Sequence, residues 1–502
     1  MDLCINKYND IWMDNALENF YYLLDTFDYN SEINLSLNEN SLQISCENEV
    51  FEDVLVRIFE NHKQFLCVNV INEEKLVKEV KKDFILIQQN KNTNEGNREV
   101  VNLKPKLFEN PKEEVNKLVS LFGEGSNKCI FCGNFFNKKY GGLTQAAYPF
   151  TTKIKSLNGV RSYKNGEYYS FKEYNNSVCP LCFLIGQLGW LTDNLIYRTI
   201  NNKSFLFLPK LNTIEELNEF KSDYSTLLNK NERFSNIKVS LVNDNGEFTN
   251  GKFSTLLCFY SKFFLISGEM PNVSWDIFEI PLGKLKNVKL IEFSFDDEIL
   301  NIIKTFVDED EDIFNLFNSI LFFNNDSKDW NIINEIRENL SESFLKNDFR
   351  SFSKNFVLRK GGKITYSNNN IEFLKYFDLL ITLWRLNPMS ITEDDLKSIK
   401  SVGNIISKVS VLNSSLFYKL DKIRSIDDFW RYLSEVSRKL INPKINQKFI
   451  RKNAIEDLIL LLKRNDNDWE EIKNLLIIYS AIQYSRDSLN DNESNEGNEN
   501  GN

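Results

Sequence analysis

Hydrophobic residues near the start of the chain recur at helical spacing and predict an amphipathic helix over residues 10–25. Asp10 stands where the N-cap of this helix would lie, and aspartate is a favoured capping residue. The expected apolar face consists of Met13, Leu17, Phe20 and Leu24. Apolar and polar residues then alternate over 33–37 and 42–46, around a polar run, which predicts a β-hairpin.

The next part of the chain mixes helical and extended patterns. Residues 49–61 have helical periodicity, whereas residues 65–70 and 84–89 are typical of strands. Another helix is expected to begin after Asn110 as its N-cap, with Pro111 at its first position, and to end at Gly123. Its apolar face would consist of Val115, Leu118, Val119 and Phe122.

The hydrophobic pattern of the second half of the chain changes near residue 371, from mixed extended and helical to purely helical. Before it, extended patterns alternate with a helical one over Thr213–Leu228, and we expect strands within Ser204–Leu208, Phe253–Ile266 and Val288–Phe293. After it, helical periodicity continues with short polar joints and predicts a helical bundle over Ile371–Leu386, Thr392–Val409, Ile426–Leu440, Ala454–Leu462 and Trp469–Ser485. The last residues are rich in Asn and Glu, and we expect them to be disordered.

Composition sets limits on the kind of protein. The chain has 502 residues and 42% hydrophobic residues, enough for about two or three domains with cores of their own. No apolar run approaches the roughly 18 residues that a membrane span needs. The first residues lack the basic and then apolar plan of a signal peptide. We therefore expect a cytoplasmic protein with no membrane contact.

Candidate catalytic residues are scarce. The one histidine, His62, leaves no room for a histidine-based triad or a histidine-rich metal enzyme. Glycine motifs that bind phosphates or dinucleotides are missing. A nuclease that uses carboxylates and two metal ions stays open as an alternative, although no motif supports it. We expect no enzymatic activity and name no catalytic residue.

Two Cys-x-x-Cys pairs are the strongest chemical signal in the sequence. Cys129 and Cys132 form the first pair, and Cys179 and Cys182 form the second. Each pair places two thiolates on one tight turn, and four thiolates suit a tetrahedral zinc ion with bonds of about 2.3 Å. An iron–sulfur cluster uses the same ligands and stays open, as does a redox dithiol. The other cysteines, Cys4, Cys46, Cys67 and Cys258, are expected to be reduced core residues.

These patterns together predict an α+β fold. It would consist of a mixed N-terminal region with an inserted four-cysteine zinc-finger-like module, and an all-α C-terminal helical bundle. We expect an N-terminal part over residues 1–110, the zinc-stapled module over 111–200 and an α+β middle region over 201–365. A helical bundle over 366–486 and a disordered tail over 487–502 follow.

Basic residues gather in two places although the formal net charge is −10. One stretch runs from Lys128 to Cys182 and the other from Arg438 to Arg464. Local basic islands on an acidic chain suit phosphate contacts at defined places. Amide side chains can reach base edges, and cationic ones can contact phosphates. Candidate nucleic-acid contacts are Asn134, Lys138, Lys139, Gln145, Arg161, Lys164, Lys448, Arg451 and Lys452. The alternative is that these side chains only keep the surface solvated.

The cysteine pairs and their setting resemble a known family. Four pieces match in order: Trp12-Met-Asp-Asn-Ala-Leu17, Cys129-Ile-Phe-Cys-Gly133, Tyr148-Pro149-Phe150 and Cys179-Pro-Leu-Cys182. This order resembles the CXXC–CXXC family of CRISPR-associated proteins, the large subunit of type I-B interference complexes (Cascade). Apart from the Trp12–Leu17 piece, the specific motifs fall within residues 110–195, and elsewhere the likeness is only one of general sequence pattern.

The resemblance implies a non-catalytic subunit of a complex that a crRNA guides. Such a subunit helps to recognise the PAM in double-stranded target DNA, to begin strand separation and to steady the non-target strand in antiviral defence. Its implied partners are the backbone subunit, the subunit at the crRNA 5′ end, the crRNA-processing subunit and a helicase–nuclease recruited after R-loop formation. In some relatives a separate small subunit starts within the same gene, and Met389 would be the start here. A purely structural scaffold role for the zinc module stays open beside this interpretation.

Overall fold

A computed structural model describes most of the chain. The described residues are 1–61, 107, 110–142, 147–148, 162–164, 167–169, 177–190, 196–200, 203–227, 251–267, 273–281, 289–324, 327–358, 362–366, 370–386, 391–412, 415–442, 451, 453–465 and 468–496. The expected strands at 65–70 and 84–89, together with His62, Cys67 and Met389, lie outside these residues. The chain forms two compact units, which are residues 1–248 with 269–294, and residues 249–268 with 295–502.

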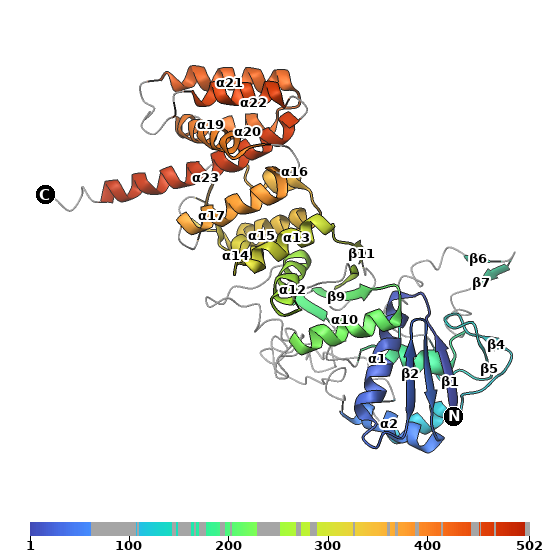
Figure 1. The fold of residues 1–502 in the computed structure, drawn as a ribbon. Coiled ribbons are helices and arrows are strands. Elements are labelled where there is room, and N and C mark those ends of the chain that lie inside the picture. The colour runs from blue at the N-terminus through green and yellow to red at the C-terminus, as the bar shows by residue number, and fades with distance from the viewer. Residues whose placement is uncertain are drawn as a thin grey trace, which may run out of the picture. The chain divides into compact units, whose positions relative to one another are not determined.

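The first unit is mixed α and β (Figure 1). Two sheets have more than two strands, in the orders β1-β3-β2 and β11-β10-β9-β8, and every pairing in them is antiparallel. The unit's elements are β1 (Asp2–Asn6), α1 (Ile11–Phe27), β2 (Asn34–Asn38), β3 (Ser41–Ser45), α2 (Asn48–Asn61), α6 (Pro111–Val119), β4 (Asn127–Lys128), β5 (Phe135–Phe136), β6 (Ser162–Lys164), β7 (Glu167–Tyr169), α9 (Pro180–Leu188), β8 (Ile196–Ile200), β9 (Lys203–Lys210), α10 (Ile214–Leu227), β10 (Ser274–Pro281) and β11 (Lys289–Phe293).

Helix α1 is the central element of this unit. Asp10 caps it as expected, because the carboxylate accepts hydrogen bonds from the backbone of Trp12 and Met13, both at 3.0 Å. The apolar face packs in one core with α2, α6 and α9. The polar face is buried too, because α10 and β9 contact the helix. There the ammonium of Lys221 pairs with the carboxylate of Glu18 at 2.5 Å, and both side chains are almost fully buried.

The second unit is largely helical and carries one small sheet, in the order β13-β12-β14 (Figure 1). In this unit the carboxylate of Glu338 accepts hydrogen bonds from the backbone amides of Phe253 and Ser254 at the start of α12. The unit's elements are α12 (Lys252–Ser267), α13 (Asp297–Asp308), α14 (Ile313–Asn318), β12 (Ile320–Asn324), β13 (Ser327–Lys328), α15 (Trp330–Leu345), α16 (Phe349–Lys354), β14 (Gly362–Tyr366), α17 (Asn370–Ile381), a π-helix (Thr382–Leu386), α19 (Glu393–Leu412), α20 (Ser415–Asp421), α21 (Ile426–Leu440), α22 (Ala454–Arg464) and α23 (Trp469–Glu496).

The structure confirms the α+β class and the helical C-terminal region, and it corrects several details. The apolar run 253–266 is a helix and not a strand, since a continuous apolar run fits either element when it is buried on all sides. Asn110 precedes α6 but its side chain caps nothing. Cys4 is exposed and Cys46 half-buried, so of the cysteines expected in the core only Cys258 is buried among the described residues. Helix α23 continues to Glu496, well into the tail that we expected to be disordered.

Two of these corrections have a plain physical reason. Cys4 lies on the solvent side of β1, where side chains alternate between the core and water, and a cysteine is small enough to sit on either side. In α23, a polar composition argues against packing but not against helix growth, because each added residue needs only the hydrogen bond to the preceding turn.

Candidate metal centre

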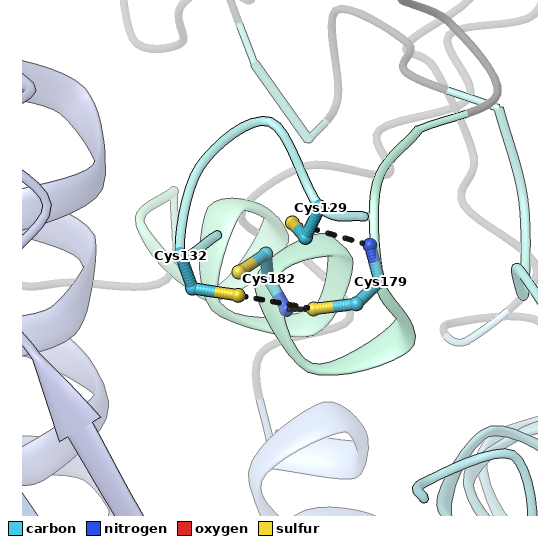
Figure 2. Close-up of side chains that lie close together, drawn as sticks. All are labelled: Cys129, Cys132, Cys179 and Cys182. Carbon is cyan, nitrogen blue, oxygen red and sulfur yellow. Dashed lines mark hydrogen bonds between the residues drawn. The ribbon is translucent and has the colours of Figure 1, made fainter. Parts of the chain in front are cut away.

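The four cysteines come from two short structures that face each other. Cys129 and Cys132 lie in the turn that joins β4 to β5, and Cys179 and Cys182 lie at the start of α9 (Figure 2). The backbone amide of Ile130 donates to the carbonyl of Ser177 at 2.8 Å and ties the two structures together. All four side chains point toward a common centre (Figure 2).

The local sequence explains both turns. In the first, Gly133 has a φ of +74°, a left-handed conformation that glycine adopts without strain, and its amide donates to the carbonyl of Cys129 at 3.1 Å. In the second, Pro180 occupies the first position of α9, where a missing amide proton costs nothing. Cys179 is the N-cap, and its sulfur accepts a hydrogen bond from the amide of Cys182 at 3.4 Å.

The spacing of the sulfur atoms fits a tetrahedral metal ion. The four Sγ atoms lie within 4.8 Å of one another, and those of Cys132 and Cys179 are 3.9 Å apart. Bonds of about 2.3 Å at tetrahedral angles would separate the sulfurs by about 3.8 Å. The side chains therefore need little rearrangement to bind one ion. Among the residues that the structure describes, no other group of His, Cys, Asp and Glu side chains is arranged to share a metal ion.

Each of the four thiols affects the ionisation of the others. Hydrogen bonds from Cys132, Cys179 and Cys182 lower the pKa of Cys129 far below its ordinary value. Burial raises the pKa of Cys182, and hydrogen bonds with the other three thiols add to this. Against the opposite effect of Cys129, hydrogen bonds with Cys179 and Cys182 also lower the pKa of Cys132. Ionisation of all four thiols would put several negative charges in one buried place. A bound cation would offset those charges, so the donor set suits a thiolate-bound metal.

Tyr8 adds a group that the sequence did not point to. Its hydroxyl lies 3.5 Å from the sulfur of Cys182, within hydrogen-bonding distance for a sulfur atom. Burial, followed by the nearby Cys182, raises the pKa of Tyr8 well above its ordinary value, so the hydroxyl keeps its proton. A protonated hydroxyl can donate to a thiolate and orient it, as outer groups do around metal ligands.

Trp12 anchors the second cysteine pair to the core. Its indole Nε1 donates to the carbonyls of Ala147 and Gly186, both at 3.1 Å, and its ring lies 4.6 Å from that of Trp190. Gly186 permits this approach, because a Cβ there would stand 2.1 Å from the carbonyl oxygen of Ala147. Asn19 also donates to the carbonyl of Leu188 at 2.6 Å, near the end of α9.

Tyr148 links the first cysteine pair to the same helix. Its hydroxyl donates to the carboxylate of Asp10 at 2.7 Å, and its ring lies 5.0 Å from that of Phe131, between Cys129 and Cys132. Three segments far apart in the sequence, around residues 12, 148 and 180, therefore meet at the metal centre.

The turn next to the first pair presents several predicted contact residues to solvent. Asn134, Lys138 and Lys139 are exposed, and so is the ring of Phe135, at 57%. Ile130 is also exposed, at 37%. The prediction did not include these two apolar side chains. Gln145 and Arg161 lie outside the described residues, and the side chain of Lys164, in β6, does as well.

The basic stretch of the helical unit looks different. Arg451 pairs with Asp457 at 2.9 Å, and Arg464 pairs with Asp395 at 2.5 Å. Lys448 and Lys452 lie outside the described residues. These two arginines are thus neutralised locally, which makes the stretch a weaker candidate for phosphate contacts than its charge in the sequence indicates.

Comparison with known proteins does not assign the chain to a family. No protein-family model matches the sequence, and no curated protein is significantly similar to it. Of the helices described, none combines the length and the apolar character needed to cross a membrane.

Proposed function

We propose that the four cysteines hold a structural zinc ion. Four sulfur donors with this spacing and no oxygen or nitrogen ligand among them favour zinc over hard cations. A closed set of four protein ligands leaves no position for a substrate, which favours a structural role.

We further propose that the chain is the non-catalytic large subunit of a crRNA-guided type I-B CRISPR surveillance complex. It would take part in PAM recognition, target DNA unwinding and stabilisation of the non-target strand, together with the guide-bound subunits and a recruited helicase–nuclease. The proposal rests on the motif resemblance and on one structural observation, the turn between β4 and β5. This turn exposes the amide of Asn134, and β5 and the residues directly after it expose the ring of Phe135 and the cations Lys138 and Lys139, all next to a base held by the cysteines.

Such a turn has the chemistry that reading a short duplex requires. Lysines can contact phosphates, and the amide of Asn134 can reach base edges. Tyr148 packs against Phe131 in this turn and donates to Asp10, the N-cap of α1, so the base of the turn is held and little conformational freedom is lost on binding. The arrangement therefore suits a rigid reader that enters a groove.

The test compares DNA binding by reconstituted complexes that contain guide RNA. The variant chain carries Lys138→Glu, Lys139→Glu and Gln145→Ala. The control chain carries Lys112→Glu and Lys289→Glu, which reverse two exposed lysines elsewhere in the same unit. Zinc content and complex assembly are measured first, and binding to a library of PAM duplexes follows.

The proposal predicts that the variant loses discrimination among PAM sequences while the control retains it. Unchanged discrimination in the variant would contradict a reading role for this turn. It would favour the scaffold alternative, which the exposed Phe135 and Ile130 also suit because apolar side chains on a rigid surface bind proteins well. Cleavage of DNA by the purified chain with Mg²⁺ would favour the nuclease alternative.

A further inference from the structure

A group of cations in the helical unit lies apart from every contact residue predicted from the sequence. It consists of Arg350 on α16, Arg424 before α21 and Lys473 on α23, and is called the cation cluster below. Two of these cations share one acceptor, because Nζ of Lys473 and Nη1 of Arg424 each donate to the carbonyl of Ile423 at 3.3 Å. Two positive charges therefore converge on a neutral oxygen.

Lys473 is the unusual member of the cluster. It is only 4% exposed, and burial of an ammonium without a carboxylate partner is costly. Burial lowers the pKa of Lys473, and the charges of Arg350 and Arg424 lower it further, against the opposite effect of Glu470 and Asp421. Arg350 is brought close because α16 packs against α23.

Several other cations of this unit are neutralised by a carboxylate. Arg385, Lys400 and Arg464 each pair with a carboxylate. Within the part of the chain that the structure describes, no member of the cation cluster forms an ion pair. Arg350 and Arg424 are also exposed, so an anion from solution can reach them.

An aromatic ring completes the arrangement. Trp469 lies one helical turn before Lys473, whose ammonium is 5.4 Å from the centre of its ring. The ring is half-buried, with its centre 6.4 Å from that of Phe429, and so keeps some surface open to solvent. Cations that contact phosphates beside a ring on which a base can stack are typical of sites for single-stranded nucleic acid.

We infer that the cation cluster binds a backbone phosphate of single-stranded nucleic acid, with a neighbouring base stacked on Trp469. The inference rests on the proposed function for the source of the strand, since a displaced DNA strand is the single strand that such a complex creates. Its test does not need the complex, so the two ideas can fail separately.

The experiment measures binding of a labelled single-stranded oligonucleotide to the full zinc-loaded chain by fluorescence anisotropy, over a series of salt concentrations. The test variant is Arg350→Ala with Arg424→Ala. The control variant is Arg431→Ala with Lys463→Ala, two exposed cations of the same unit outside the cluster. A third variant, Lys473→Met, removes the buried charge while keeping a side chain of similar length, and circular dichroism checks the fold of all three.

We expect the test variant to bind about tenfold or more weakly than the native chain, and Lys473→Met to weaken binding in the same direction. The slope of log affinity against log salt should fall by about 0.7 for each phosphate that the variant no longer neutralises. The control variant should bind as the native chain does. Equal affinity of the test and control variants for the single strand would overturn the inference.

Two further arms separate the sources of the phosphate. Native chain should prefer the single strand over a duplex of the same sequence, and inorganic phosphate should compete only weakly. The assignment to a single strand would be overturned if the chain bound duplex and single strand equally. It would also be overturned if inorganic phosphate competed fully at concentrations similar to those of the oligonucleotide. If the test variant loses single-strand binding while the complex shows no PAM dependence, the cation cluster stands and the proposed function fails.

Discussion

Trp12 offers a sharp test of how the metal centre is attached to the fold. Replacing it in the variant Trp12→Phe removes the indole donor that the carbonyls of Ala147 and Gly186 share, in a place where the side chain is 1% exposed. A buried acceptor left without its donor costs about 1–3 kcal/mol. The smaller ring adds about 1 kcal/mol in lost burial and residual cavity. The free energy of unfolding of the first unit should therefore fall by about 2–4 kcal/mol.

The assay follows urea unfolding by far-ultraviolet circular dichroism and, in parallel, release of the metal to a coloured chelator. Metal release reports on the first unit alone, which matters because a chain with two compact units need not unfold in one step. The matched control is Trp330→Phe, the same change at a tryptophan that is 44% exposed, where the expected effect is within about 0.5 kcal/mol. Metal release at the same urea concentration in both variants would refute the argument that Trp12 anchors the centre.

Three other changes test separate parts of the structure. Burial raises the pKa of Asp14 to about 6, so the protonated carboxyl stabilises the folded state at low pH. This contribution, about 3 kcal/mol, is lost as the pH rises from about 4 to 6. In the variant Asp14→Asn, the free energy of unfolding measured at several pH values should no longer show this loss. Gly186→Ala should speed metal release, because the new methyl group meets the carbonyl of Ala147, and a release rate equal to that of the native chain would contradict the close approach of α9. The variant Glu338→Ala should lower the melting temperature of the helical unit more than Glu338→Gln does. The glutamine amide retains an oxygen that can accept hydrogen bonds from Phe253 and Ser254. Equal melting temperatures of the two variants would argue against this cap.

The sequence was sufficient to predict the elements whose signals are local. Asp10 caps α1, and each Cys-x-x-Cys pair forms one tight turn, because both features depend on residues close together in the chain; the meeting of the two pairs followed from ligand chemistry, since one ion needs four donors. The hairpin of β2 and β3 follows its alternation and polar turn in the same way. The third strand of that sheet, β1, was missed because its partner β3 is not the next strand along the chain, so no turn between two alternating runs marks the pairing.

Other features depend on partners that no local pattern contains. Glu18 and Asn19 look like the solvent face of an amphipathic helix, yet both are buried, because Lys221 and the end of α9 supply their partners. Helix α12 belongs to the second unit although the chain on both sides of it belongs to the first. Pairing over such separations is decided by the whole fold, so local periodicity and capping signals do not reveal it.

The central claim is that four sulfurs hold a zinc ion. The direct measurement is X-ray absorption at the zinc edge on the purified chain, with metal content determined on the same sample. We predict one zinc per chain with four sulfur ligands at about 2.3 Å. Iron in place of zinc, or a first shell containing oxygen or nitrogen in place of any of the cysteine sulfurs, would contradict it.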